Sequence, residues 1–433
     1  MVSSHLSKIL AFSLLCSVLT VISKNNCPAI EEPGVKYFDV RLPELSVPQS
    51  LTTYVCHSVT IPVTLNETYH AVAFEPVIIN EDVMHHMILF GCPEKTEATE
   101  PHACGPIDNK CRTFLVQWSM GIKGPICSYP ETGVRFGSGS LVSLSLQIHW
   151  NNQRGDLGLK DSSGVRIYYT SILHKYDLGN VQIGQNDIEI LAGQGHVEVR
   201  GSCSPACTKH WLPQAIYLTR VHIHLHFIGD GGVLELVRNG EIVREIVRDD
   251  SFDYHHPPFH DLLDAVEVLP GDELRLTCFY NSRDGSKQRN TTLYWGEGSD
   301  GEMCYAFVTY FPKVNNFDQC IQFDRYDICS PNGFTDMGGC VFEGFLRYYQ
   351  TQLAHQLIND CSSGNDLASN DSTLYVNNIC SKNCEASVRE MTENPCIQDI
   401  RLRKHTIRKY LSLEDSWSKV KVILDAAKRY CTD

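Results

Sequence analysis

The sequence predicts an all-β fold: two tandem antiparallel β-sandwich domains, jelly-roll-like, followed by a cysteine-rich and partly helical C-terminal extension. Between about residues 27 and 312, short runs with the two-residue period of strands alternate with turn residues. After about residue 316, apolar side chains take helical spacing, and nine cysteines lie in or beside this tail. We therefore expect domains at residues 27–175 and 176–318 and the extension at residues 319–433.

Residues 141–150 form the clearest predicted strand, because apolar and polar side chains alternate as in a strand with one buried face. Further strands are predicted at residues 165–169, 188–191, 216–228, 233–237 and 305–311. Turn residues such as Asn239-Gly240 separate them. In the tail, helices are predicted at residues 345–358 and 412–427, the second opened by a capping box from Ser412 to Asp415.

The N-terminal residues and the cysteines predict a secreted or lumenal protein. Lys8 precedes an apolar run at residues 9–22, which is too short for a membrane span of about 20 residues and fits a signal peptide at residues 1–24. The alternative is an uncleaved N-terminal anchor, and no later segment is apolar enough to span a bilayer. Without Cys16, eighteen cysteines remain, which are enough for nine disulfides in an oxidising compartment.

Two further features bear on surface and partners. Sequons at Asn66, Asn290 and Asn370 predict a glycoprotein. The net charge of −14 argues against a nucleic acid or an anionic membrane surface as the main partner, and it selects no substrate.

The 18 histidines are unevenly distributed, and the first cluster is His85-His86-Met87 within the apolar residues 83–90. One buried histidine is usually a satisfied core residue, but two in succession are costly to bury without a partner and favour a metal. Adjacent strand residues point to opposite faces, so joint ligation needs a bulge or a strand end. His149, on the polar face of its predicted strand, is unremarkable alone.

A third cluster places His222, His224 and His226 at alternate positions, so that three imidazoles share one face of a predicted strand. An i, i+2 pair on a strand can converge on one ion, and imidazole suits copper or zinc. The alternative is a solvated strand face. Met303 would be a core residue by composition alone, but a thioether is a soft ligand that favours Cu(I) over zinc.

In this order, the clusters resemble the copper type II, ascorbate-dependent monooxygenases, the family of dopamine β-hydroxylase and of the peptidylglycine α-hydroxylating enzyme. The resemblance covers roughly residues 35–325. The matching motifs are Thr52-Thr53-Tyr54-Val55-Cys56 (family TTYxC), His85-His86-Met87 (HHM), Gly301-Glu302-Met303-Cys304 (EEMC) and residues 161–170, which are similar to a dopamine β-hydroxylase segment.

The resemblance implies two copper ions per chain, in two sandwich domains that face each other across a solvent-filled cleft, with ascorbate as the electron donor. The implied ligands are His85, His86 and His149 for an electron-transfer copper, and His224, His226 and Met303 for the copper at which O2 reacts. Tyr54 and His224 are the implied active-site residues, although a tyrosine beside a cysteine also suits simple packing. The implied disulfides are Cys56–Cys104, Cys92–Cys111 and Cys278–Cys304, with Cys203 and Cys207 reaching the tail (Cys320 is a candidate for Cys203); Cys127 has no family counterpart.

Three histidines stand where the family has an HxH pair, so two registers are possible. Read without gaps over residues 215–240, the dopamine β-hydroxylase pattern selects His224 and His226. The peptidylglycine enzyme's RVHTH selects His222 and His224 but needs a two-residue insertion. We prefer the ungapped register, which puts His222, and not Arg220, where the amidating enzyme carries its arginine for the substrate carboxylate.

These observations predict a monooxygenase that uses O2 to hydroxylate an unactivated C–H bond of a small amine-like substrate. The alternatives are peptidylglycine hydroxylation and a secreted copper-binding protein without catalysis. The presence of all six implied ligands argues against the last alternative. The sequence does not indicate an oligomeric state.

Overall fold

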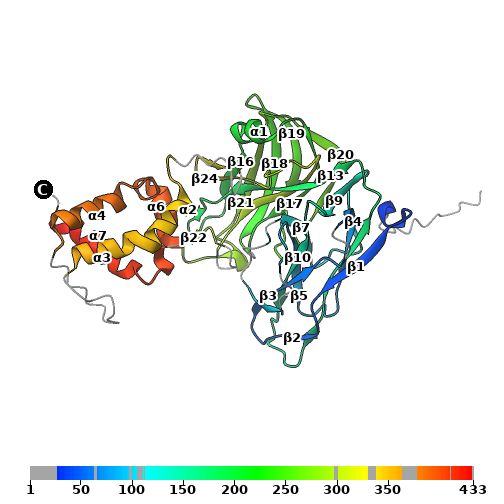
Figure 1. Ribbon diagram of the computed structural model, residues 1–433, viewed down its shortest axis with the longest axis horizontal. Coiled ribbons are helices and arrows are strands. Elements are labelled where there is room, and N and C mark those ends of the chain that lie inside the picture. The colour runs from blue at the N-terminus through cyan, green and yellow to red at the C-terminus, as the bar shows by residue number, and fades with distance from the viewer. Residues whose placement is uncertain are drawn as a thin grey trace, which may run out of the picture.

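The computed structural model describes residues 27–62, 66–96, 100–104, 111, 113–296, 301–329, 338–362, 378–409 and 411–431. The predicted signal peptide and Asn370 lie outside these residues, whereas Asn66 and Asn290 are exposed. Within the described ranges, we find no helix long and apolar enough to cross a membrane. Figure 1 shows sheets through most of the chain and helices gathered at the C-terminal end.

The first sandwich is built from a six-stranded and a five-stranded sheet that share one core. The larger sheet has the order β1-β12-β4-β9-β13, with β8 paired to β4, and the smaller has the order β6-β3-β10-β5-β7. The strands are β1 (Lys36–Arg41), β2 (Leu45–Ser46), β3 (Thr52–Thr60), β4 (Thr68–Val77), β5 (Met84–Cys92), β6 (His102–Ala103), β7 (Thr113–Ser119), β8 (Ile126–Cys127), β9 (Thr132–Gly137), β10 (Ser143–Asn151), β11 (Lys160–Asp161), β12 (Gly164–Thr170) and β13 (Tyr176–Asp177).

The second sandwich is built in the same way. A six-stranded sheet, in the order β20-β17-β23-β14-β24-β25, shares a core with a four-stranded sheet, in the order β16-β21-β18-β19. Its elements are β14 (Gly179–Gln185), β15 (Glu189–Ile190), β16 (Val197–Cys203), α1 (Pro205–Trp211), β17 (Ile216–His224), β18 (Gly229–Arg238), β19 (Glu241–Asp249), β20 (His260–Val268), β21 (Glu273–Tyr280), β22 (Leu293–Tyr294), β23 (Cys304–Phe311), β24 (Gln319–Phe323) and β25 (Tyr326–Ile328). The predicted all-β fold is confirmed, with two parallel strand pairs, β9–β13 and β14–β24, among the antiparallel ones. The predicted domain boundaries stay predictions.

Two predicted strands differ in detail from the structure. The strand predicted at residues 141–150 is β10, but its polar face, which carries Gln147 and His149, is buried as well. β10 is the central strand of its sheet, and on this face the Tyr54 ring stacks on His149 with centroids 4.4 Å apart, while the Thr96 N–H donates to Ser143 Oγ at 3.0 Å. The expected exposed face was therefore wrong.

The strand predicted at residues 216–228 ends earlier, because β17 stops at His224. The chain then turns, and the Gly229 N–H donates to the His226 carbonyl at 3.1 Å. His226 therefore does not share a regular strand face with His222 and His224, contrary to the prediction. The turn places the last histidine of the run at the end of the sheet.

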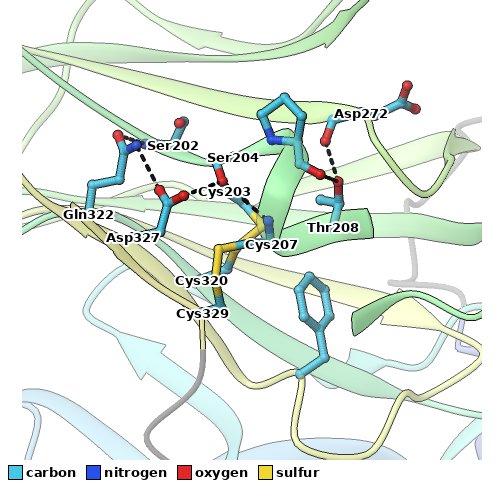
Figure 2. The surroundings of a disulfide bond; sticks show 12 residues. Ser202, Cys203, Ser204, Cys207, Thr208, Asp272, Cys320, Gln322, Asp327 and Cys329 are labelled. Atoms are coloured by element: carbon cyan, nitrogen blue, oxygen red, sulfur yellow. Dashed lines mark hydrogen bonds between the residues drawn. A yellow bond between two sulfur atoms is a disulfide. The ribbon is translucent and has the colours of Figure 1, made fainter. Parts of the chain in front are cut away.

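A pair of disulfides joins α1 and β16 to the strands that lead into the extension (Figure 2). Cys203–Cys320 and Cys207–Cys329 lie side by side there. The Asp327 carboxylate accepts hydrogen bonds from Ser204 Oγ at 2.6 Å and from Gln322 Nε2 at 3.0 Å, which ties β25 to β24 and to the start of α1. The expectation that Cys203 and Cys207 reach the tail is confirmed.

The C-terminal extension is helical and has its own core. Its elements are α2 (Phe342–Tyr348), a π-helical turn (Tyr349–Leu353), α3 (Ala354–Cys361), α4 (Lys382–Thr392), α5 (Pro395–Gln398), α6 (Ile400–Lys409) and α7 (Trp417–Tyr430). The helix predicted at residues 345–358 is confirmed as α2 to α3. The capping box predicted from Ser412 to Asp415 is wrong: α7 begins later, and its N-cap Ser416 makes no side-chain capping bond.

All eighteen cysteines from Cys27 onward are paired, in nine disulfides. The implied pairs Cys56–Cys104, Cys92–Cys111 and Cys278–Cys304 are confirmed. Cys127, for which no partner was predicted, bonds Cys27. The remaining three disulfides lie within the extension: Cys340–Cys396, Cys361–Cys384 and Cys380–Cys431.

Candidate copper centres

The first histidine site, formed by His85, His86 and His149, lies on β5 and β10 of the first sandwich. Its three residues offer ligand atoms that all lie within 4.8 Å of one another. Two adjacent histidines reach the same point because the ladder shifts there: His149 pairs with His86, while Trp150 pairs with Met84. His85 is the extra residue of this bulge, as the sequence required for joint ligation.

The ring nitrogens of the first histidine site converge as metal ligands do. His86 Nδ1 lies 3.1 Å from His85 Nδ1 and 3.3 Å from His149 Nδ1. A nitrogen of a neutral imidazole either carries one hydrogen or has one lone pair, so His86 Nδ1 cannot form a full hydrogen bond with both neighbours at once. In addition, His149 Nε2 is buried without a hydrogen-bond partner. Three lone pairs around one point suit a copper ion.

Burial keeps the imidazoles of this site neutral, and metal ligands must be unprotonated. Burial, with smaller contributions from His255 and His256, lowers the pKa of His85 to about 4. Burial lowers the pKa of His149 to about 3. The Tyr54 ring, from β3, stacks on His149 with centroids 4.4 Å apart and so holds that imidazole in place.

The second candidate site, His224, His226 and Met303, lies at the end of β17 and the start of β23. His224 pairs with Tyr305 in the antiparallel ladder. After the turn, the His226 N–H donates to the carboxylate of Glu302 at 2.9 Å, which brings His226 to the segment that carries Met303. The rings of His224 and His226 are 5.4 Å apart and nearly perpendicular, at 87°. His226 Nδ1 lies 3.0 Å from the Gly301 carbonyl, which can only accept, so Nδ1 carries the proton and Nε2 keeps the lone pair that could bind a metal.

Glu302 organises the second site, and sequence reasoning assigned it no role. Its side chain is 1% exposed. Its carboxylate accepts backbone N–H groups of His226 and Ile228, each at 2.9 Å, and of Met303 at 3.3 Å. Burial raises the pKa of Glu302 to about 7, although these three hydrogen bonds lower it. The residue ties the histidine turn to the methionine segment.

His222 and Arg220, the two other candidates in this run, are placed differently. His222 is stacked on Phe259 with centroids 4.3 Å apart, and its Nδ1 lies 3.1 Å from the Pro258 carbonyl. His222 pairs with Phe307, four residues beyond Met303. Arg220 forms an ion pair with Asp261.

The comparisons with known proteins show two matched domains, and each contains one of the two candidate sites. Residues 38–156 match the family model of the copper type II ascorbate-dependent monooxygenase N-terminal domain, and residues 176–330 match that of the C-terminal domain. The chain belongs to this family. Copper and ascorbate are therefore its expected cofactors, and the predicted resemblance and enzyme class are confirmed.

Individual relatives show the same likeness. The chain is 32% identical to dopamine beta-hydroxylase from Bos taurus over 307 residues, which are 66% of this chain and 49% of the relative. It is 30% identical to DBH-like monooxygenase protein 1 from Homo sapiens over 301 residues, 65% of this chain and 48% of the relative. The chain thus spans about half the length of the curated relatives it matches. Among solved structures, the glycosylasparaginase PNGase F from Flavobacterium meningosepticum covers 64% of this chain and 95% of its own, with 9% identity and a TM-score of 0.32, too low to bear on the fold.

Alanine variants of His226 and His222 are expected to distinguish the two registers. His226→Ala should leave about one copper per chain, because it removes the imidazole held next to the Met303 segment by Glu302. His222→Ala should retain two, and serves as the matched control from the preceding strand, β17. Metal analysis of copper-loaded protein decides between them; the reverse result would select the register of His222 and His224.

Proposed function

We propose that this protein is a copper- and ascorbate-dependent monooxygenase that uses O2 to hydroxylate an unactivated C–H bond of a small amine-like substrate. The observation that supports this most is the pairing of two different donor sets, one in each family-matched half of the chain. One set has three imidazoles, and the other has two imidazoles and a thioether.

The balanced overall reaction takes R–H, O2, two electrons from ascorbate and two protons to R–OH and water. Copper would supply the one-electron redox chemistry at both sites. We assign His85, His86 and His149 to the site that passes electrons, and His224, His226 and Met303 to the site with an open position. Tyr54 orients His149 by stacking, and the Gly301 carbonyl fixes the tautomer of His226.

The surroundings of Arg220 support an amine-like substrate over a glycine-extended peptide. A peptide carboxylate needs a cation that is not already paired. Arg220 Nε is bound to Asp261, and its Nη2 donates to the Cys127 carbonyl at 3.0 Å. His222, the alternative residue at this position, is buried beneath Phe259. Neither side chain therefore presents an unpaired cation to the carboxylate of a peptide terminus.

The test combines copper content with ascorbate-dependent O2 uptake. We expect two coppers per chain and O2 uptake coupled to a hydroxylated product with a member of a panel of small amines. Uptake with glycine-extended peptides alone would favour the peptidylglycine alternative. Two coppers with no uptake on either panel would favour a binding protein without catalysis, and fewer than two coppers in fully loaded protein would overturn the proposal.

We also propose that the protein is secreted or lies in the lumen of the secretory pathway. Nine disulfides in the chain support an oxidising compartment. The exposure of Asn66 and Asn290 fits glycosylation at those sequons. Endoglycosidase treatment of the protein from a secreting cell should therefore lower its apparent mass.

A further inference from the structure

A loop of the second sandwich reaches the first histidine site. Residues 250–259, which we call the bridging loop, connect β19 to β20. The Tyr254 ring lies 5.6 Å from the ring of His85 and 6.2 Å from that of His226, centroid to centroid. The His255 ring lies 5.9 Å from that of His85. One aromatic side chain therefore contacts a histidine of each site.

The bridging loop is anchored on its own sandwich. Phe252 is buried in the second core, and its N–H donates to the Asp230 carbonyl at 3.1 Å. The Asp253 carboxylate accepts the N–H of His255 at 2.9 Å and lies 2.9 Å from His256 Nδ1. These bonds fix the loop conformation, so the direction of the Tyr254 and His255 side chains is set by the second sandwich.

The loop also packs closely against the first sandwich. A Cβ built on Gly121, in the turn after β7, would lie 3.2 Å from the His256 ring. A residue larger than glycine would therefore fit there only if the ring shifted. The bridging loop therefore contacts the first sandwich at Gly121 as well as at His85.

We propose that the bridging loop sets the separation of the two histidine sites, with Tyr254 as the positioning residue that packs between His85 and His226. The ring itself makes the contact, since centroid distances of 5.6 and 6.2 Å are those of packed aromatic pairs. The inference rests on the proposed function, because the separation matters to electron transfer only if both sites bind copper.

Hydrogen exchange of the metal-free, full-length protein tests the contact without copper. Tyr254→Ala should speed exchange of the Met120 amide, which donates to the His85 carbonyl at 3.1 Å, several-fold relative to the wild type. Tyr254→Phe, which keeps the ring, should not. Tyr37→Ala removes a tyrosine that is 57% exposed on β1, and is the matched control. Unchanged exchange in Tyr254→Ala would overturn the proposal.

Pulsed electron paramagnetic resonance of the oxidised, copper-loaded protein tests the separation. Tyr254→Ala should lengthen and broaden the distance between the two Cu(II) ions, whereas Tyr254→Phe and Tyr37→Ala should match the wild type. Tyr254→Leu, which loses the ring but stays apolar, replaces the alanine variant if that variant does not fold. An unchanged distance in the ring-less variant would also overturn the inference. Wild-type protein that binds fewer than two coppers would instead contradict the proposed function, and the exchange experiment would still decide the role of the loop.

Discussion

Replacing Met303 with leucine is expected to remove the copper of the second site and to abolish product formation, while the first histidine site keeps its copper. Met303 is 8% exposed and packs with Tyr305 and Ile321. Leucine has nearly the same volume, so the packing is retained. Only the soft sulfur donor for Cu(I) is lost. Turnover should fall by roughly 100-fold or more, because even the outer partners of metal ligands are worth 10–100-fold.

Metal analysis and X-ray absorption measure this effect. Met303→Leu should bind about one copper per chain, and the Cu–S scattering of reduced wild-type protein should disappear. Met87→Leu is the matched control, because Met87 is fully buried in the first core and follows His86 directly. That variant should keep both coppers and the sulfur signal. Two coppers and an unchanged sulfur signal in Met303→Leu would exclude Met303 as a ligand.

Replacing Glu302 with alanine should both destabilise the protein and empty the second site. The change leaves the buried N–H groups of His226, Ile228 and Met303 without their acceptor. Each buried, unsatisfied donor costs about 1–3 kcal/mol, so the loss of the acceptor for three donors should lower the free energy of unfolding by at least about 3 kcal/mol. Urea unfolding of the metal-free protein measures this loss, and copper analysis of the folded variant should find about one ion.

Two further variants serve as a conservative replacement and a surface control for Glu302→Ala. Glu302→Gln keeps one acceptor oxygen but turns an amide donor toward a backbone N–H, so its effect should be intermediate. Glu198→Ala, at an exposed carboxylate of β16, should change the free energy of unfolding by less than about 0.5 kcal/mol. If Glu302→Ala has the same free energy of unfolding as Glu198→Ala and binds two coppers, the Glu302 carboxylate has no structural role.

Much of the first histidine site could be predicted because its signals are local. His85 and His86 are adjacent in an apolar run, and the rule that neighbouring strand residues face apart already required a bulge. The ladder shift between His149 and Trp150 provides it. The strand pattern also predicted nearly all of β10 and the whole of β17, because alternating apolar residues indicate a strand face that packs on a core.

The features that escaped prediction depend on contacts between distant parts of the chain. Tyr254 meets His85 across about 170 residues of sequence, and nothing in its neighbourhood indicates that pairing. Glu302 is a single acid before a methionine, and its three N–H donors come from the turn at His226 as well as from its own segment. The polar helix α4 has few apolar residues to mark a period, and its Cys384, bonded to Cys361, supplies part of its burial.

The nine disulfides form three sets of three along the sequence, and no disulfide joins one set to another. One set lies within residues 27–127, one within residues 203–329 and one within residues 340–431. Oxidative folding can therefore finish in one part before the next has left the ribosome, and an early pairing need not be reopened when later cysteines arrive. For the same reason, recombination at the borders between the sets could exchange or remove a whole part without leaving an orphaned thiol in the others.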